Sequence, residues 1–279
     1  MWDFQHEPGQ SRLRNSYDIE LTMPSECAYR LLAGRSDLGL IPVAALTPEL
    51  AVVPGCTIAS LHQVRSIQLI VKAPRTLAEV RTVAADTASR SSVAYAQVLF
   101  RHFVGVSPDF LPAPANVEAM LATADAALLI GDPALLALQR REQIETQCGP
   151  CTWFDLAEEW NRRTGLPWVA AIWAVRPAAL RTAAERERLV TDLNTSRDHG
   201  LSHIDELVQE WTPRIAVPPA TIRHYLKSNI HYTLDDRCIE AIRTFRRLAA
   251  EVRALEPLPE LNFLLGGSDW NRSSPPPTK

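Results

Sequence analysis

The stretch that most constrains the fold of this chain is Val83–Val93, where an apolar segment leads through a hydroxyl-rich turn into a helical pattern. Val83–Ala85 is apolar, and from Val93 onward the apolar residues recur with the period of a helix. The pattern predicts a buried strand, a turn, and a helix that starts near Ser91. The free N–H groups at the start of a helix attract anions, and hydroxyl side chains add further donors.

Hydroxyl side chains and one arginine crowd this turn and make it a candidate site for a carboxylate or a phosphate. The candidate residues are Thr87, Ser89, Arg90, Ser91 and Ser92. The alternative is ordinary N-capping by Ser89 or Ser91, which any helix start can show. The residues by themselves leave both interpretations open.

A second corner of the same kind follows where the apolar segment Ala126–Ile130 meets Gly131. Asp132 and Pro133 are typical of a helix start, with Asp at the cap and Pro at the first helical position. Ligands of parallel α/β sheets collect where strand ends face helix starts, so Gly131 and Asp132 join the candidate site. Asp132 is either a proton relay or simply the helix cap.

Strands and helices alternate through the middle of the chain, which favours an α/β fold with a parallel sheet. Ser66–Lys72 and Leu166–Val175 flank this part, and their pairing would form a two-stranded hinge between two lobes. We therefore expect a two-lobed fold: lobe 1 comprises residues 1–72 and 173–270, lobe 2 comprises residues 73–172, and residues 271–279 form a disordered tail.

The remaining segments give a coarser prediction. Residues 1–18 are polar and predict irregular structure, whereas the chain from Arg181 onward predicts helices. Between them the pattern predicts a strand at Ile19–Thr22, a helix from Pro24 that Gly34 ends, a strand at Leu38–Val43 and a turn at Val53–Gly55.

The composition excludes several classes of protein. The formal net charge of −3 gives no basic field for nucleic acid. No apolar run approaches the roughly 18 residues that span a bilayer, and residues 1–7 have no cationic or apolar export signal. We therefore expect a cytoplasmic protein without a nucleic-acid or membrane partner.

The five cysteines fit a reducing compartment. Cys148 and Cys151 have the CxxC spacing of thioredoxins, but a polar stretch precedes them and the Gly-Pro between them is typical of a turn. This spacing therefore does not predict a redox site.

No metal site is predicted either. His199 and His203 lie four residues apart, but no third ligand is near them in the sequence. The other cysteines are isolated in the sequence: Cys27, Cys56 and Cys238.

Several spaced motifs together resemble the menaquinone-biosynthesis family that contains the chorismate dehydratase of the futalosine pathway. These motifs are Leu40–Val43, Ile58–Ser60 with Val64–Ser66, Asp86–Val93, Ile130–Asp132, Asp155–Trp160, and Thr164–Pro167 with Trp173–Ala174. The resemblance extends over about residues 20–265. It implies an α/β fold of the two-lobed type 2 periplasmic-binding-protein kind.

The resemblance also implies an activity. A lyase of this family removes water from chorismate to give 3-[(1-carboxyvinyl)oxy]benzoate without a cofactor, and we expect a monomer or homodimer. Because chorismate is a dianion, two carboxylates must be bound, and the helix start at Ser91 and Ser92 suits one of them. Ser60, Arg65 and Ser66 are candidates for the other, with a hinge salt bridge as the alternative role of Arg65.

Two other functions remain open at this point. The sibling enzyme of the same pathway, which makes 1,4-dihydroxy-6-naphthoate, shares the fold and is expected to need a histidine in its cleft, which none of these motifs carries. A non-catalytic protein that binds small carboxylates is the second alternative, because a fold does not fix its chemistry.

The resemblance has one departure, at the amino terminus. Members of the family begin with a strand and a Ser-Tyr-Leu-Asn-Thr-like turn whose asparagine faces the substrate, and no such motif precedes Met1–Phe4. The catalytic residue is therefore unassigned, with Asp132 as a weak candidate.

We predict from this departure that the 279-residue chain is poorly stable and nearly inactive, and that a version extended upstream in its native reading frame is active. An absorbance assay of chorismate consumption, run on both versions, checks the prediction. Activity in a cooperatively folding 279-residue chain would contradict it.

Overall fold

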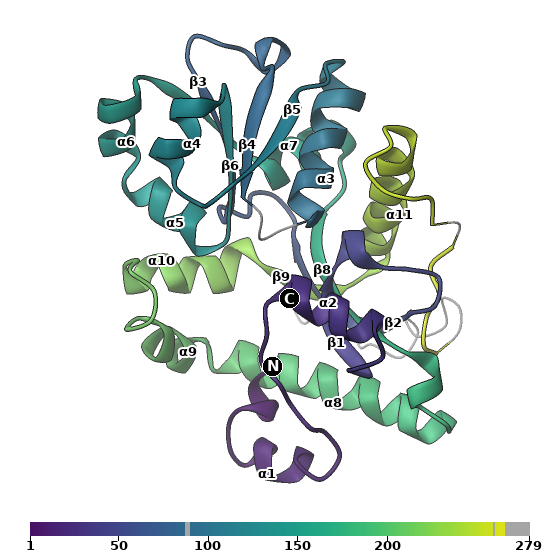
Figure 1. Ribbon diagram of the computed structural model, residues 1–279. Coiled ribbons are helices and arrows are strands. Elements are labelled where there is room, and N and C mark those ends of the chain that lie inside the picture. Colours follow the sequence, from purple (N-terminus) through teal and green to yellow (C-terminus); the bar gives the residue numbers. More distant parts are fainter. Residues whose placement is uncertain (87–89, 259, 266–279) are drawn as a thin grey trace.

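Two β-sheets, each with its own helices, make up the protein in this computed structural model, which describes residues 1–86, 90–258 and 260–265 (Figure 1). The four-stranded sheet has the order β1–β8–β2–β9, and the five-stranded sheet has the order β5–β4–β6–β3–β7. The strands are β1 (Leu38–Pro42), β2 (Ala51–Ser60), β3 (Ile67–Lys72), β4 (Thr82–Asp86), β5 (Asp109–Ala113), β6 (Ala126–Ile130), β7 (Cys151–Asp155), β8 (Trp168–Val175) and β9 (His231–Leu234).

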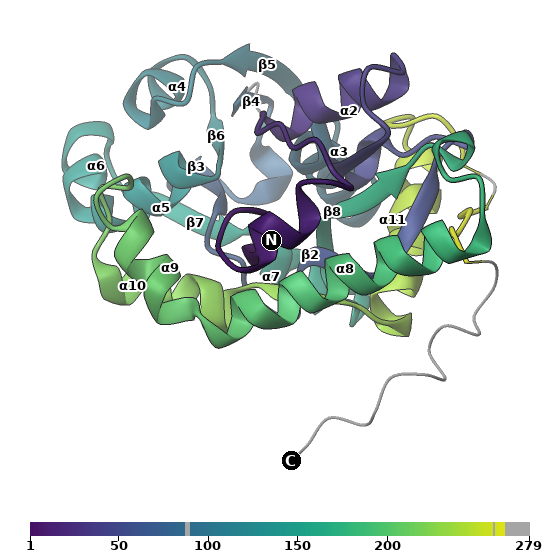
Figure 2. The same ribbon diagram turned by 90° about the horizontal axis from the view of Figure 1, so that it is seen from below.

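Helices cover both sheets, and the longest, α8, runs along the four-stranded half (Figures 1 and 2). The α-helices are α1 (Gly9–Leu13), α2 (Pro24–Leu32), α3 (Arg90–Val98), α4 (Val117–Thr123), α5 (Asp132–Gln139), α6 (Arg141–Cys148), α7 (Leu156–Thr164), α8 (Ala183–Ser202), α9 (Ile204–Trp211), α10 (Pro219–His224) and α11 (Asp236–Glu251). Short 3₁₀-helices are η1 (Trp2–Phe4), η2 (Val43–Ala45), η3 (Leu77–Glu79) and η5 (Pro177–Ala179), and π-helices are η4 (Leu99–Val104) and η6 (Tyr225–Asn229). Among the described helices, none combines the length and the apolar character needed to cross a membrane.

The strand ends that bear on function lie together at one edge of each sheet. In the four-stranded sheet, the ends of β1 and β2 meet the starts of β8 and β9, since Ser60 pairs with Trp168 and Ala59 with His231. In the five-stranded sheet, the ends of the parallel strands β4, β5 and β6 lie beside the start of β3, because Ile67 pairs with Ile130.

These two edges face each other, and we call the region between them the seam. The backbone N–H of Ala44, just after β1, donates to Oγ of Ser91 in α3 at 3.1 Å. The seam therefore joins the carboxyl end of a strand in one half to the start of a helix in the other.

A cluster of aromatic rings fuses the two halves into one core. The Tyr95 ring in α3 stacks on Phe245 of α11 with centroids 3.7 Å apart, and it meets Trp160 of α7 edge-on at 5.1 Å. The Tyr95 hydroxyl donates to the carbonyl of Val169 in β8 at 3.1 Å. Because these elements come from both halves, the same buried cluster stabilises both sheets.

A second apolar contact joins the two halves below the five-stranded sheet (Figure 1). Leu135 of α5 is buried against Val208 of α9, against Val217 in the loop that follows, and against Ile222 of α10. The carboxyl-terminal helices thus reach across to the half that contains α5.

The prediction of irregular structure for residues 1–18 is wrong, because η1 and α1 pack against α8 (Figure 2). The buried residue Asp3 holds this segment in place. Its backbone N–H donates to Ser196 Oγ at 2.9 Å, and its carboxylate pairs with His199 and Arg12. The signal in the sequence is weak, since the partners lie nearly two hundred residues away.

The predicted hinge pairing of Ser66–Lys72 with Leu166–Val175 is also wrong. β3 is bonded to β6 and β7 in the five-stranded sheet, whereas β8 is central in the four-stranded sheet. The chain passes from the four-stranded to the five-stranded sheet between β2 and β3 and returns between β7 and β8. The division into lobes at residues 72–73 and 172–173 stays a prediction.

Three smaller predictions fail as well. Ile19–Thr22 forms no strand, and Val53–Gly55 is an irregularity inside β2 and not a turn. The region after Arg181 contains the strand β9 among its helices. The predicted tail, residues 271–279, lies outside the described residues.

We predict that Tyr95→Ala lowers the free energy of unfolding by about 3–5 kcal/mol, because it removes a ring buried between both halves. Tyr95→Phe keeps the ring and loses only the hydrogen bond to Val169, so it should cost about 1 kcal/mol. Urea unfolding followed by circular dichroism measures both. Equal losses in the two variants would contradict a role for ring packing.

Candidate active site

The first corner has the predicted form, with β4 ending at Asp86 and α3 beginning at Arg90. Thr87 and Ser89 lie outside the described residues. Ser91 and Ser92 are buried in the first turn of α3, whereas Arg90 is exposed. Ser91 Oγ accepts the hydrogen bond from Ala44 across the seam, and a hydroxyl that accepts one bond can still donate its own proton.

A buried cation lies on the other side of Ala44. The Arg246 guanidinium of α11 donates to the carbonyl of Ala44 at 3.0 Å and to that of Glu256 at 3.1 Å. Burial lowers the pKa of Arg246, and no carboxylate pairs with it among the described residues. An uncompensated cation and the positive end of α3 therefore lie on either side of one residue, a combination that attracts an anion.

Two buried donors without acceptors lie at the seam edge of the four-stranded sheet. Ser60 and Trp168 are each 1% exposed and are direct partners across β2 and β8, so their side chains share a face. The Trp168 ring lies 5.4 Å from Tyr95, which turns this face toward α3. Neither Ser60 Oγ nor Trp168 Nε1 has a hydrogen-bond partner among the described residues. Such donors are rare unless a ligand or water completes them.

Ser66 and Gly131, two of the predicted residues, are in direct contact. The N–H of Gly131 donates to the carbonyl of Ser66 at 2.7 Å. The hydroxyl of Tyr225, in η6, donates to Ser66 Oγ at 3.1 Å. Burial raises the pKa of Tyr225, so its phenol stays neutral and keeps its proton.

Asn229, at the end of the same π-helix, adds an acceptor to the seam. It is 4% exposed, and its Nδ2 donates to the carbonyl of Gln63 at 3.1 Å. Its Oδ1 has no donor among the described residues. Single π-helical turns occur frequently at functional sites.

Asp132 does not have the capping role that the sequence suggested. Gly131 is the N-cap of α5, with φ of 71°, and no side-chain hydrogen bond caps the helix. Asp132 is exposed as the first residue of α5. The capping interpretation is therefore wrong, and a role as proton relay stays a prediction.

Asp155 holds the chain where it crosses the seam. Its carboxylate accepts the N–H of Val64 at 3.2 Å and that of Arg65 at 2.5 Å. It also caps α7 by accepting the N–H groups of Ala157 and Glu158. Burial raises the pKa of Asp155, while the backbone N–H groups act in the opposite direction.

Arg65 has its own strained backbone in this crossing, with φ of 64°. Its guanidinium makes no ion pair with any residue that the structure describes, so the alternative of a hinge salt bridge is not observed. The carboxylate that fixes this turn is instead that of Asp155, through the backbone.

The sequence did not point to Trp168, Tyr225, Asn229 or Arg246. Trp168 lies inside the predicted strand Leu166–Val175, where an aromatic residue indicates only a buried sheet. Tyr225 and Asn229 fall in a segment predicted as helical, and no local pattern shows that it reaches Ser66. Arg246 is one of several arginines in a charged helix, and only the fold reveals its burial.

The CxxC pair, Cys148 and Cys151, differs from catalytic cysteines in the direction of its pKa shift. Burial raises the pKa of both Cys148 and Cys151, whereas catalytic cysteines have a lowered pKa.

Comparison with known proteins identifies the family of this chain. A family model described as menaquinone biosynthesis matches residues 2–251. A curated chorismate dehydratase from Thermus thermophilus is 30% identical over 225 residues, which are 77% of this chain and 80% of the relative.

Solved structures identify the fold. A protein from Archaeoglobus fulgidus superposes with a TM-score of 0.64 at 14% identity, over 88% of this chain and 91% of the other. The periplasmic aliphatic sulphonate binding protein of Escherichia coli superposes with a TM-score of 0.61 at 14% identity, over 91% and 83% of the two chains. The expected two-lobed type 2 periplasmic-binding-protein-like fold is thereby confirmed.

We predict that Asp155→Ala lowers the free energy of unfolding by about 3 kcal/mol or more, since backbone donors at the crossing and at α7 lose their acceptor together. Asn116→Ala is the matched control, because Asn116 caps α4 alone and should cost about 1 kcal/mol. Urea unfolding compares them. Losses of similar size would show that Asp155 acts as an ordinary cap.

Proposed function

Because this chain belongs to the menaquinone biosynthesis family, we propose that it removes water from chorismate to give 3-[(1-carboxyvinyl)oxy]benzoate. The similarity to the curated chorismate dehydratase from Thermus thermophilus supports this reaction, since it extends over the larger part of both chains. The protein is thus a lyase of menaquinone biosynthesis. The sibling naphthoate-forming enzyme and a non-catalytic carboxylate-binding protein are not favoured, since the curated relative is a dehydratase.

The observation that carries the proposal at the level of residues is the buried, uncompensated Arg246 beside the start of α3. Chorismate is a dianion, and a site for it must offset two negative charges. A buried cation that is bonded only to carbonyl groups leaves a positive potential at the seam. The start of α3 adds the positive end of its helix dipole and the hydroxyls of Ser91 and Ser92.

In our proposal the substrate carboxylates bind to two sets of donors. One carboxylate is held by the start of α3, at Ser91 and Ser92. The other is held by Ser60 Oγ and Trp168 Nε1, whose protons lack an acceptor in the described protein. Trp168 Nε1 is only a donor, so a carboxylate oxygen is the group that satisfies it.

Our proposal assigns the remaining predicted residues to the surroundings of these two sets. Ser66 and Gly131 lie at the start of β3 and the end of β6, and Arg65 lies in the crossing beside them. Contacts of Arg65, Gly131 and Asp132 with the substrate remain predictions, as do those of Thr87, Ser89 and Arg90.

Loss of water from chorismate makes an aromatic ring, so the driving force comes from the substrate. The protein has to hold both carboxylates, exclude water and move a proton. The hydroxyl and one ring C–H proton leave together as water, so a proton that the neutral Tyr225 phenol gives to the departing hydroxyl has to be replaced by the ring proton. The hydrogen-bonded pair of Tyr225 and Ser66 is suited to relay it. Asn229 Oδ1 is suited to accept a hydrogen bond from that hydroxyl while it is still on the ring.

We also propose that the enzyme acts in the cytoplasm as a monomer or homodimer. The five cysteines are all free, including the pair only three residues apart, which fits a reducing compartment. Size-exclusion chromatography with light scattering measures the assembly.

We predict that Ser60→Ala raises KM for chorismate, and Kd for the product, by about 10-fold to 100-fold, because a hydrogen bond to a carboxylate is lost. The same change should leave the melting temperature unchanged or higher, since the hydroxyl has no partner in the described protein. Turnover of chorismate, product calorimetry and thermal melts measure these effects.

Ser196→Ala is the matched control, because Ser196 is equally buried but bonds to Asp3 away from the seam. It should lower the melting temperature and leave KM and Kd as they are. Unchanged KM and Kd in Ser60→Ala would refute the proposed carboxylate contact. Absence of chorismate turnover and of product binding in both the 279-residue chain and the version extended upstream would refute the proposed function itself.

A further inference from the structure

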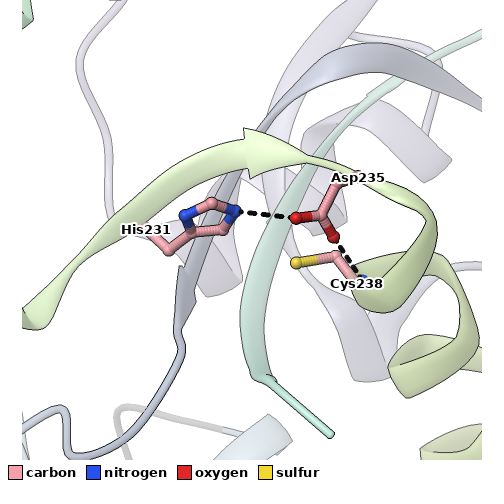
Figure 3. Close-up of side chains that lie close together, drawn as sticks. All are labelled: His231, Asp235 and Cys238. Carbon is pink, nitrogen blue, oxygen red and sulfur yellow. Dashed lines mark hydrogen bonds and ion pairs between the residues drawn. The ribbon is translucent and has the colours of Figure 1, made fainter. Parts of the chain in front are cut away.

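His231, Asp235 and Cys238 converge where β9 gives way to α11 (Figure 3). One nitrogen, one oxygen and one sulfur from these side chains all lie within 4.8 Å of one another. His231 opens β9, Asp235 is the N-cap of α11, and Cys238 lies in its first turn. Cys238 was isolated in the sequence, and only the turn from strand to helix brings it to the other two.

The backbone fixes this arrangement. His231 is held in the sheet by its pairing with Ala59 in β2. Asp235 Oδ1 accepts the N–H of Cys238 at 2.8 Å, which leaves Oδ2 free of that role. Oδ2 lies 3.3 Å from His231 Nε2 (Figure 3). A ligand could therefore bind Oδ2 without loss of the helix cap.

The three side chains supply the donor types that zinc prefers. Zinc takes His nitrogen, carboxylate oxygen and Cys sulfur at about 2.0–2.3 Å, so that tetrahedral ligand atoms lie about 3.3–3.8 Å apart. The three ligand atoms lie within 4.8 Å of one another, so side-chain movements of about 1 Å bring them to the separation that zinc requires. Magnesium and calcium prefer oxygen ligands alone and do not match this set.

His231 supplies the second observation that points to a ligand. Its Nε2 is buried and pairs with Asp235 Oδ2 at 3.3 Å, but the two atoms are poorly aligned for a hydrogen bond. A metal ion between the two groups would replace this pair and bind the nitrogen and the carboxylate oxygen together. Asp235 remains partly exposed, which gives the ion a path from solvent.

The competing explanation is a helix cap with a histidine partner and an inert buried thiol. Burial raises the pKa of Cys238 to about 12, so the thiol is neutral in the protein alone. A bound cation has to displace that proton, which only a thiophilic metal does readily.

We propose that His231, Asp235 and Cys238 bind one zinc ion, with the fourth position open to water. The ion would tie β9 to the start of α11. Asn229 lies two residues before His231, so the same tie would stiffen one wall of the seam. This site is separate from the proposed chorismate site and does not depend on it.

Titration of the metal-free protein with zinc, in competition with a chromophoric chelator, tests the proposal. Cobalt serves as a spectroscopic probe, since thiolate ligation gives a sulfur-to-cobalt charge-transfer band. We expect one zinc per chain, a charge-transfer band, and a higher melting temperature with zinc. A chain that competes for no zinc would overturn the proposal.

The variants assign the ligands. Cys238→Ala should abolish the charge-transfer band and weaken zinc binding at least tenfold, and His231→Gln should weaken binding while it keeps the band. Cys148→Ala combined with Cys151→Ala removes two thiols that lie close together in the sequence. This double variant should change neither the charge-transfer band nor the affinity for zinc. The proposal fails if Cys238→Ala keeps the band and the affinity, or if the double variant abolishes them.

Discussion

The structure depends on how the chain is fixed where it crosses between its two sheets, and the buried carboxylate of Asp155 provides that constraint. It accepts the backbone N–H groups of Val64 and Arg65 on the outward crossing and caps α7 on the return. One side chain thus aligns both crossings. The two sheet edges can then face each other, and the Tyr95 ring cluster packs the halves together behind them.

The prediction from sequence was best where local pattern decides structure. The corners at Asp86–Arg90 and Ile130–Asp132 were foreseen because an apolar run followed by turn chemistry specifies a strand and a helix start. The sequence did not predict which sheet contains β3, since an apolar strand has no feature that identifies its neighbouring strands. The capping role of Asp132 failed because Gly131 adopts the cap position, and the site residues Tyr225 and Arg246 depend on contacts between distant segments.

The seam contains groups that make the protein less stable than it would otherwise be. Within the described part of the chain, the donors of Ser60 and Trp168 are buried without acceptors, and Arg246 is buried without a carboxylate. Each costs free energy of folding that an apolar side chain would not. Such unfavourable groups persist at binding sites because a ligand supplies what the protein lacks. Ser60 and Trp168 lie at the edge of the four-stranded sheet that is turned toward α3, where Trp168 borders the aromatic core at Tyr95.

The packing of Leu135 against Val208, Val217 and Ile222 bears on how a ligand enters. Any movement that separates α5 from α9 and α10 exposes these side chains to water and is opposed by the hydrophobic effect. If a dianion contacts both edges as proposed, it opposes the same movement, so the apolar contact and the bound charge act together against opening. A product held between the edges then leaves only when the contact between α5 and the carboxyl-terminal helices breaks.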